Sequence, residues 1–403
     1  MASNRIHWRF ADLIDKGILQ IGDGYRAKNS ELGGSGPIFL RAGQVTDEGI
    51  SVHGTERFHA SLAEKVGSKI AQAGDTVVTT KGNSTGRTSY VTDTMPCFVY
   101  SPHLSFWRSA NRDILDPRFL RYWAIGAEFR EQLHGMKAST DMAPYLSLTD
   151  QRRLWITVPS LPEQRAIGQI LGAFDDKIEL NRRMNETLGA LAQSLFQAWF
   201  VSPTRDGLPK GWREGTLGEV AENPRRGIQP DEIEPSTPYI ALEHMPRRCI
   251  ALSGWGYADN LESNKFQFKR GEILFGKLRP YFHKVGIAPT DGVCSTDILV
   301  IRPQEPAWFG FVLGHVSSVE LVNHTDAASS GTKMPRTNWQ DISRFGVALP
   351  PPSLVAQFTE EIRPLVDRII ANIHESRTLG SLRDALLPKL LSGEIRVRSR
   401  RGE

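Results

Sequence analysis

The hydrophobic positions in the middle of the chain recur at alternating steps of four and three residues, over roughly Leu161 to Val201. Alternating steps of this kind form the seam of a coiled coil, in which each seam side chain packs against a second helix. The pattern therefore predicts a long helix with a partner helix. Its seam positions are Ile167, Leu171, Phe174, Ile178, Asn181, Asn185, Leu188, Ala192, Leu195 and Trp199.

The same spacing returns near the C-terminus at a constant offset of 191 residues. We therefore expect the partner helix in the same chain. Each copy, about 33 residues long, would form a rod of about 50 Å at the rise of an α-helix. The second set of seam positions is Phe358, Ile362, Leu365, Ile369, Asn372, Ser376, Leu379, Arg383, Leu386 and Leu390.

Two asparagines, Asn181 and Asn372, occupy the same seam position in the two copies. A buried asparagine in a seam lowers stability but fixes register and orientation. The alternative is that each asparagine lies on a solvated helix face. The second copy also contains Pro364, which lacks a backbone donor and clashes with the preceding turn. We expect that helix to be kinked or to start near Pro364, and Pro388 to limit its far end.

The segments before the two helices also correspond, although their offset drifts as it would with loop insertions. The matched stretches begin at Trp8 and Trp212, Gly36 and Thr237, Gly74 and Gly271, and Ser101 and Ser295. The chain is therefore predicted to be a tandem duplication of one unit, a globular part followed by a long helix. The expected limits are 1–160 and 204–350 for the globular parts, and 161–203 and 351–403 for the helices.

Local signals in the globular parts favour strands. Short β-branched or aromatic runs bounded by Gly, Asp or Pro are found at 76–80, 273–275 and 298–301. A helix is expected over Pro117–Leu133, with Phe119, Leu120, Trp123 and Phe129 on its apolar face. Each copy then reaches a strand that ends in proline, at 154–159 and 345–350. The fold class is therefore α+β: two globular domains of mixed α/β structure joined by two long antiparallel coiled-coil helices in a pseudo-two-fold repeat.

Composition adds little to this picture. The formal charge of +4 and pI near 8.9 permit an acidic partner such as DNA without demonstrating one. Cys97, Cys249 and Cys294 are far apart, which favours reduced thiols in a cytosolic protein over disulfides or a thiolate metal site. The sequence has no apolar run long enough to span a membrane and no apolar signal core at its start, so no membrane partner is expected.

Candidate catalytic motifs fail on inspection. The stretch GEILFGK from Gly271 fits the start of a phosphate-binding loop, but Leu278 replaces the Ser or Thr that would reach magnesium. Asn223-Pro224 resembles the start of the base-binding tetrapeptide of amino-methyltransferases, yet Arg225 and Arg226 follow where a proline and an aromatic residue belong. There is no HExxH or GxSxG motif either. We therefore expect a chain without catalysis, metal or cofactor of its own.

Each copy carries a basic loop directly after the matched strand, at 81–87 and 277–284. Lysine and arginine neutralise phosphates, and Arg or Asn can pair with base edges, so such loops suit DNA. An ordinary solvated loop is the alternative for either one alone, but the recurrence at equivalent places favours double-stranded DNA. The candidate DNA contacts are Lys81, Asn83, Ser84, Arg87, Arg225, Arg226, Lys277, Arg279 and Lys284.

Two equivalent binding parts related by a pseudo-two-fold axis would read two half-sites about one helical turn apart, on the order of 10 bp. Because the two copies differ in sequence, the half-sites should differ too.

The chain closely resembles the specificity subunits of type I restriction-modification systems over essentially its full length. The most specific stretch is the 41 residues from Leu161 to Val201, supported by GDTVVTTKGNSTGR from Gly74 and by the C-terminal stretch from Pro350 to Ile395. In the latter, Leu354-Val355-Ala356-Gln357 replaces the usual proline-glutamate-glutamine run.

The resemblance implies two target recognition domains that each read half of a bipartite site, and two conserved helices that pack antiparallel as a ruler. It implies two modification subunits that methylate adenine, and restriction subunits that translocate and cleave DNA. S-adenosylmethionine, ATP and magnesium would then belong only to those partner chains, and the protein would be cytoplasmic and nucleoid-associated when bound to DNA. Phe196, Phe200 and Leu387, which lie off the seam, are candidates for methyltransferase docking if exposed, or for packing against the recognition domains.

Two other hypotheses remain. The chain could be part of a self-contained restriction-methylation enzyme, against which the missing motifs count, or a coiled-coil protein whose globular parts bind proteins. A neighbouring methyltransferase gene would favour the specificity subunit.

Overall fold

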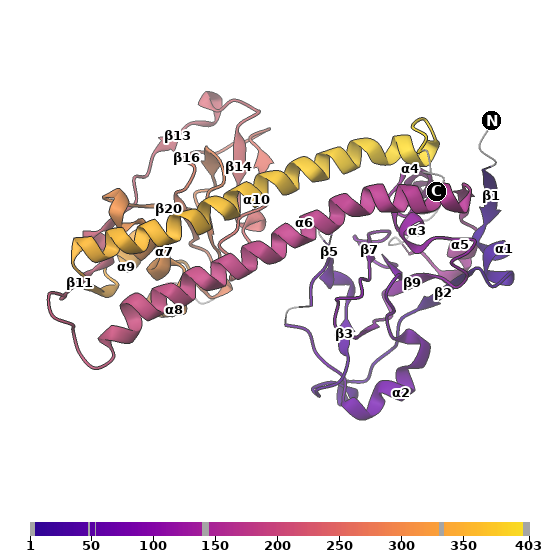
Figure 1. Cartoon of the computed structure of the whole chain (residues 1–403), viewed down its shortest axis with the longest axis horizontal. Helices are drawn as coiled ribbons and strands as arrows, with labels where there is room; N and C mark the ends of the chain where they lie inside the picture. The colour runs from indigo at the N-terminus through magenta and orange to yellow at the C-terminus, as the bar shows by residue number, and fades with distance from the viewer. Residues whose placement is uncertain (1–4, 47–48, 53, 139–144, 330–333, 398–403) are drawn as a thin grey trace, which may run out of the picture. The chain divides into compact units, whose positions relative to one another are not determined.

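The computed structural model describes residues 5–46, 49–52, 54–138, 145–329 and 334–397. The chain forms two compact units, a first unit of residues 1–176 and 380–403 and a second unit of residues 177–379. Two long helices, α6 (Leu161–Phe196) and α10 (Pro352–Ser392), each continue from one unit into the other (Figure 1). Each unit therefore holds one globular part and a portion of each long helix. The domain limits predicted from the sequence coincide with the ends of the long helices, whereas the boundary between the two compact units falls inside those helices.

The first unit is built on a four-stranded antiparallel sheet in the order β2-β9-β6-β7. Its strands are β2 (Leu19–Asp23), β9 (Leu104–Ser109), β6 (Thr76–Thr79) and β7 (Thr88–Tyr90). The smaller pairs are β1 (Ile6–Arg9) with β10 (Trp155–Val158), β3 (Ile38–Leu40) parallel to β8 (Phe98–Tyr100), and β4 (Val45–Thr46) with β5 (Gly49–Ile50). The helices are α1 (Phe10–Asp15), α2 (Ala63–Val66), α3 (Pro117–Trp123), α4 (Ala127–Ala138) and α5 (Leu148–Arg152).

The second unit repeats this plan with the sheet order β12-β20-β17-β18. Its strands are β12 (Ala221–Glu222), β20 (Ile298–Pro303), β17 (Ile273–Gly276) and β18 (Val285–Ile287). A five-stranded sheet contains β13 (Gly227–Ile228), β16 (Lys265–Phe268), β19 (Gly292–Cys294), β14 (Pro238–Ile240) and β15 (Gly256–Tyr257). Strand β11 (Arg213–Thr216) pairs with β21 (Gly346–Leu349), and the helices are α7 (Phe309–Val316), α8 (Val319–Ala328) and α9 (Trp339–Ser343).

The two strand orders are equivalent position by position. Strand β6 lies between β9 and β7 as β17 lies between β20 and β18, and the parallel pair β3-β8 corresponds to the parallel pair β14-β19. In both units a strand that ends just before the long helix pairs with the first strand of the unit. The predicted α+β tandem repeat is therefore confirmed. Because Ile273–Gly276 forms strand β17 rather than a turn that opens a helix, the stretch from Gly271 does not have the form of a phosphate-binding loop.

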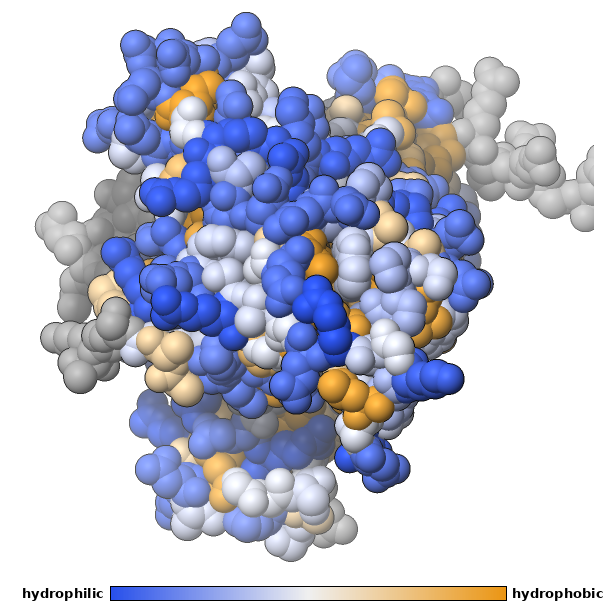
Figure 2. Space-filling model, turned by 90° about the vertical axis from the view of Figure 1, so that its left-hand side faces the viewer, coloured by the Kyte–Doolittle hydropathy of each residue, from blue (hydrophilic) through white to orange (hydrophobic). Residues whose placement is uncertain are grey.

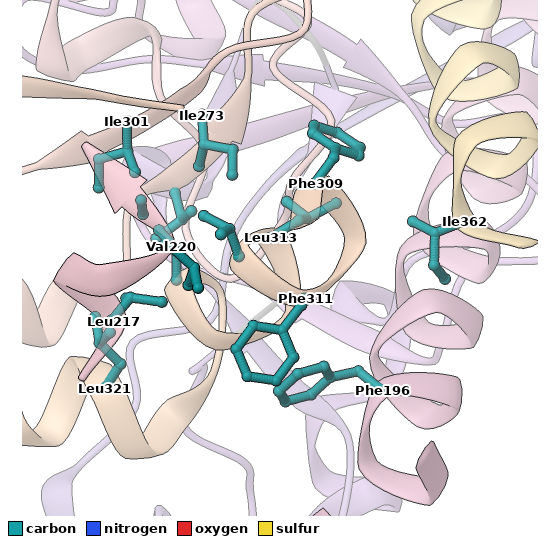
Figure 3. Close-up of a cluster of buried hydrophobic side chains, with 14 of the residues drawn as sticks. Phe196, Leu217, Val220, Ile273, Ile301, Phe309, Phe311, Leu313, Leu321 and Ile362 are labelled. Atoms are coloured by element: carbon teal, nitrogen blue, oxygen red, sulfur yellow. The ribbon is translucent and has the colours of Figure 1, made fainter. Parts of the chain in front are cut away.

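The core of the second unit includes one face of each long helix. Phe196 of α6 and Phe200 of the π-helical segment Gln197–Val201 that follows it are almost fully buried. Their ring centroids lie 6.3 and 5.1 Å from that of Phe311 of α7, and Figure 3 shows Phe196 beside Phe311. A Cβ atom on Gly314 of α7 would lie 2.1 Å from the Phe196 ring, so glycine is needed there for the close approach. The expectation that Phe196 and Phe200 are exposed for docking was therefore wrong; both pack against the globular part.

The first unit buries the opposite ends of the same helices. Ile167 and Leu171 of α6 join Leu387 and Leu390 of α10 in a core with Trp107 and Trp123. Leu387 is 8% exposed, so its predicted exposure for docking was also wrong. The physical reason is the same in both units: a helix carries an apolar face for its partner helix and a second one for the globular part.

Two helix predictions need correction. The segment Pro117–Leu133 forms two helices, α3 and α4, with a break at 124–126, although its predicted apolar side chains are all buried. Helix α10 begins at Pro352 and continues through Pro364, so the expected start near Pro364 was wrong. Pro364 lies on an exposed face, and the carbonyl left without a donor belongs to the exposed Glu360, where water can satisfy it. Pro388 lies four residues before the end of the helix.

The face shown in Figure 2 is largely hydrophilic, with hydrophobic residues in small separate groups. Among the helices of the described residues, none combines the length and the apolar character that crossing a bilayer requires.

Candidate nucleic-acid interface

The β6–β7 loop of the first unit is a tight glycine-bearing turn. Gly82 and Gly86 adopt left-handed conformations with φ of 85° and 88°, and a Cβ atom on Gly86 would lie 2.0 Å from Leu133. The backbone amide of Gly86 donates to the Thr79 carbonyl at 2.7 Å, and the Thr85 hydroxyl donates to the Gly82 carbonyl at 2.6 Å. The loop is therefore held in one shape by its own backbone.

The candidate DNA contacts of this loop fall into two groups. Lys81 and Asn83 have exposed side chains, whereas Ser84 and Arg87 are half-buried. The Arg87 guanidinium donates to the carbonyl of Val45 at 3.3 Å, which ties the loop to β4. Lys81 and Asn83 are thus placed to meet a ligand from solvent, and Arg87 is placed to hold the loop.

The equivalent β17–β18 loop of the second unit is shaped without glycine at its turns. Arg279 and His283 have φ of 52° and 50°, and they flank a short 3-10 turn, Pro280–Phe282. Non-glycine residues in the left-handed region are uncommon and strained, so the surrounding contacts must hold them there. The Arg279 amide donates to the Pro335 carbonyl at 2.8 Å, and the His283 carbonyl accepts from the Arg248 amide at 2.8 Å.

The candidate contacts in this unit are also divided. Arg225 is exposed, and Lys277 and Arg279 are half-buried at the loop. Burial lowers the pKa of Lys277, and the nearby Asp297 opposes this shift. Arg226 forms an ion pair with Glu272, and the Lys284 ammonium donates to the Leu242 carbonyl at 2.5 Å. These last two side chains stabilise the unit, and of the predicted set Arg225, Lys277 and Arg279 are better placed for a phosphate.

Two further arginines lie beside the β17–β18 loop. The Arg247 guanidinium lies 3.9 Å from the centroid of the Phe282 ring, and Arg336 pairs with Asp297 at 3.4 Å. Both Arg225 and Arg336 lie close enough to Lys277 to lower its pKa. Neither Arg247 nor Arg336 was among the DNA contacts predicted from the sequence. We call Arg225, Arg247, Lys277, Arg279 and Arg336 the basic cluster.

A short segment crosses the loop at the same place in both units. In the second unit the Thr337 amide donates to the Lys277 carbonyl at 3.1 Å, and in the first the Leu146 amide donates to the Thr80 carbonyl at 2.9 Å. Lys81 forms a single β-bridge with Tyr145, as Leu278 does with Arg336. The two loops are therefore equivalent in three dimensions as well as in sequence.

His283 makes the second loop sensitive to pH. Its Nε2 lies 3.0 Å from the Ser317 carbonyl and donates to it in the neutral ring, while burial lowers its pKa below the ordinary value of 6.5. A histidine whose pKa is lower in the folded than in the unfolded protein makes its full contribution to stability when the pH is above the unfolded-state pKa. That contribution is lost as the pH falls below about 6.5. One proton limits the slope to about 1.4 kcal/mol per pH unit.

We therefore expect the melting temperature of the protein to fall less steeply between pH 6.5 and 5 when His283 is replaced by asparagine. Asparagine tolerates the left-handed backbone at this position. Thermal unfolding of both proteins across this range is the measurement, and parallel pH profiles would contradict the expectation.

Within the described residues, no group of three or more His, Cys, Asp or Glu side chains is arranged to hold a metal ion. Of the three cysteines, Cys294 is buried and its burial raises the pKa of the thiol to about 12.

The helix seam has different chemistry in the two units. All of the predicted seam positions are buried or half-buried. Ile167, Leu171, Asn181, Ile362, Ile369 and Asn372 are buried, and Phe174, Ile178, Leu188, Leu195, Leu365, Leu379 and Leu386 are half-buried.

Both matched asparagines lie in the second unit and are fully buried. The Asn372 amide donates to Asn185 Oδ1 at 2.8 Å, and the Asn181 amide donates to Glu375 Oε2 at 2.8 Å and to Ser376 Oγ at 3.2 Å. These contacts join α6 and α10 in antiparallel register (Figure 1). A shift by one turn would leave these buried amides without partners, so the contacts fix the register.

In the first unit a carboxylate takes this role. Asp175 of α6 accepts from the Tyr122 hydroxyl at 2.6 Å, pairs with Arg121 at 2.7 Å, and pairs with Arg383 of α10 at 2.6 Å. It thereby links α3 of the globular part to both long helices.

Comparison with known proteins gives consistent matches. The model of the type I restriction modification DNA specificity domain matches residues 16–190. The chain is 28% identical over 280 residues to the type I restriction enzyme MjaIX specificity subunit of Methanocaldococcus jannaschii, an alignment that covers 63% of each protein. It is 22% identical to the type I restriction enzyme HindI specificity subunit of Haemophilus influenzae, with 81% of this chain and 88% of that protein covered.

The fold has a counterpart among solved structures. The crystal structure of the type I restriction-modification system S subunit from M. genitalium superimposes with a TM-score of 0.53 at 16% identity, over 96% of each chain. At that identity the likeness concerns the fold alone.

Proposed function

We propose that this chain is a specificity subunit of a type I restriction-modification complex and selects the DNA target of that complex, because it is similar to the specificity-domain model and to the specificity subunits matched above. In this proposal each globular part reads one half of a bipartite double-stranded site. The chain itself performs no catalysis.

The observation that carries the proposal is the recurrence of one basic loop at one place in both units. Each loop follows the central strand of its sheet, is crossed by the same short segment, and presents cations to solvent. Phosphate contacts by lysine and arginine supply most of the affinity for DNA, and base-edge contacts supply sequence preference. A repeated arrangement suits a ligand that itself repeats, as the DNA duplex does.

The two loops differ in chemistry, and this supports an asymmetric target. The first presents Lys81 and Asn83 on a glycine turn, whereas the second presents the basic cluster around an aromatic tip. An asparagine amide can pair with adenine, and arginine pairs with guanine. We therefore expect unlike half-sites separated by bases that the protein does not read.

The chemistry of the complex would lie in other chains. We propose that two modification subunits use S-adenosylmethionine to methylate adenine in the selected site. Restriction subunits would use ATP and magnesium to cleave unmethylated DNA. The complex would act in the cytoplasm, on the nucleoid.

A matched surface on the two long helices fits two copies of one partner. The stretch Thr-Leu-Gly-x-Leu occurs once in each helix, at 187–191 and 378–382, and at the same place in the repeat. Leu191 and Leu382 are 45% and 48% exposed, and Thr187 and Thr378 beside them are exposed as well. We propose this pair of surfaces for methyltransferase docking, in place of the buried Phe196, Phe200 and Leu387.

Replacing Leu191 or Leu382 by aspartate is expected to weaken one of two methyltransferase contacts by roughly tenfold or more, because a charge would enter the centre of the contact. The double variant should lose both copies. Leu180→Asp is the control, because Leu180 is 53% exposed on α6 but its repeat equivalent is Ala371. Mass measurement of the purified complexes gives the stoichiometry, and full assembly of the double variant would disprove this docking surface.

The proposed function is tested by co-expressing the chain with the methyltransferase subunit of its system and mapping methylated adenines in the host genome. A split, asymmetric motif that disappears when the chain is deleted is the expected result. Methylation that is the same with and without the chain would overturn the proposal and favour a protein-binding role.

A further inference from the structure

An exposed tyrosine occupies the tip of the β17–β18 loop. Tyr281 is 46% exposed and lies in the middle of the Pro280–Phe282 turn, with the basic cluster around it. We infer that Tyr281 contacts a base pair and determines the preference of the second unit at one position of its half-site. This inference rests on the proposed function.

The backbone around Tyr281 is fixed from both sides. The Phe282 amide donates to the Arg279 carbonyl at 2.9 Å and the His283 amide donates to the Pro280 carbonyl at 2.7 Å, which closes the turn. Outside it, the left-handed residues Arg279 and His283 bond to Pro335 and Arg248 through their own backbones. Left-handed backbone at two non-glycine residues is unfavourable, so its presence on both sides of one exposed ring indicates that the position of the ring matters.

The side chain next to Tyr281 is also fixed. The Phe282 ring packs against the Tyr281 ring with centroids 4.8 Å apart at 69°, and Arg247 lies over its centroid at 3.9 Å. Arg279 lies 5.8 Å from the same centroid. The Tyr281 ring thus packs against an aromatic ring that also lies close to two guanidinium groups. Arginine beside an exposed ring suits a duplex, because phosphates pair with the guanidinium while the ring reaches the groove.

The chemistry of the ring defines what it would read. The edge of a tyrosine ring presents apolar carbons and one hydroxyl. The carbons can pack on the methyl group of thymine, or on the same edge of a base that lacks this methyl group, and the hydroxyl can form a hydrogen bond to a neighbouring base atom. The first unit has no aromatic residue in its loop and presents Asn83 instead. The two units would therefore read their half-sites by different kinds of contact, apolar in the second and amide in the first.

The experiment uses the full chain in complex with its methyltransferase, carrying Tyr281→Ala or Tyr281→Phe. Tyr257→Ala is the control, because Tyr257 is 54% exposed in the same unit but lies on strand β15. Methylated motifs are mapped in cells, and binding is measured on duplexes that vary one base pair at a time in each half-site. In Tyr281→Ala, the discrimination between base pairs at one position of the second unit's half-site is expected to fall about tenfold, while the base preferences in the other half-site stay the same. Tyr281→Phe should retain most of it, because the ring remains.

Each outcome decides the inference. Relaxation at one position of one half-site, absent in Tyr257→Ala, supports it. An equal loss of binding on every duplex, or no change in any preference, overturns it. If the unsubstituted complex shows no bipartite motif at all, then the proposed function fails, and that result is distinct from any effect of Tyr281.

Discussion

Replacing Asp175 by alanine is expected to lower the free energy of unfolding of the first unit by about 3 kcal/mol. The carboxylate is only 11% exposed and holds Arg121 and Tyr122 of α3 together with Arg383 of α10. Burial raises the pKa of Tyr122, so its hydroxyl stays protonated and donates. Removing the carboxylate would leave Arg121 beside the core without its ion-pair partner and Arg383 with only the exposed Asp384, and that loss exceeds the value of a surface ion pair. Hydrogen exchange of first-unit amides measures this change directly.

The adjacent Asp176 provides the matched control. It pairs with Arg118 at 3.1 Å, but both side chains are more than 40% exposed, so Asp176→Ala should cost about 0.5 kcal/mol. Equal losses in the two variants would contradict the role given to Asp175.

The second unit indicates how the loss at Asp175 can be reversed. At the repeat-equivalent positions of Asp175 and Arg383 it has Val366 and Ala192, which are both buried and apolar. The double variant Asp175→Val with Arg383→Ala should therefore recover part of the lost stability, because Arg383 no longer needs a partner between the long helices while Arg121 still lacks one. A double variant as unstable as the single one would indicate that Arg121 needs the carboxylate independently.

The sequence predicts the helices and the repeat because both depend on spacing, which a single chain records. The seam, the matched strands and the recurring loop all follow from the period or the offset of residue types. The role of Asp175 does not, because Arg121 and Arg383 reach it from segments far apart in the chain. In the seam pattern, Arg383 is simply a departure from the apolar rule.

The incorrect docking residues have a similar explanation. A heptad pattern separates seam from non-seam positions but does not say what covers the non-seam face. Phe196 and Phe358 fit against Gly314 and Gly310 of α7, where any side chain would clash. Those glycines were the available signal, since glycine in a helix interior is unfavourable without a packing reason.

The DNA candidates were predicted from charge, and charge alone does not separate a ligand contact from an internal ion pair. Arg225 and Arg226 are neighbours in sequence, yet only Arg226 reaches a carboxylate, that of Glu272. The partner of Arg226 is 46 residues away. Local sequence therefore gives the right loop but not the right side chains within it.

Lengthening both long helices by three heptads is expected to lengthen the unread spacer by about 9 bp without changing the letters of either half-site. Both helices continue from one unit into the other, so the inserts belong between Asp176 and Lys177 and between Leu379 and Gly380, where the two units divide. Twenty-one added residues extend a helix by about 31 Å, close to one turn of B-DNA at 3.4 Å per base pair. In a ruler parallel to the duplex, the two loops would then face nearly the same side of the DNA as before.

Two heptads make the phase control. They add about 21 Å, or roughly 6 bp, which places the second half-site well away from its original face of the duplex and should weaken binding strongly. Inserting three heptads into α6 alone should prevent folding or assembly, because the seam on either side of the insert would lose its partner positions. Mapping methylated adenines for each variant gives the spacer. If the three-heptad protein methylates with the original spacer, then the helices do not set the distance between half-sites.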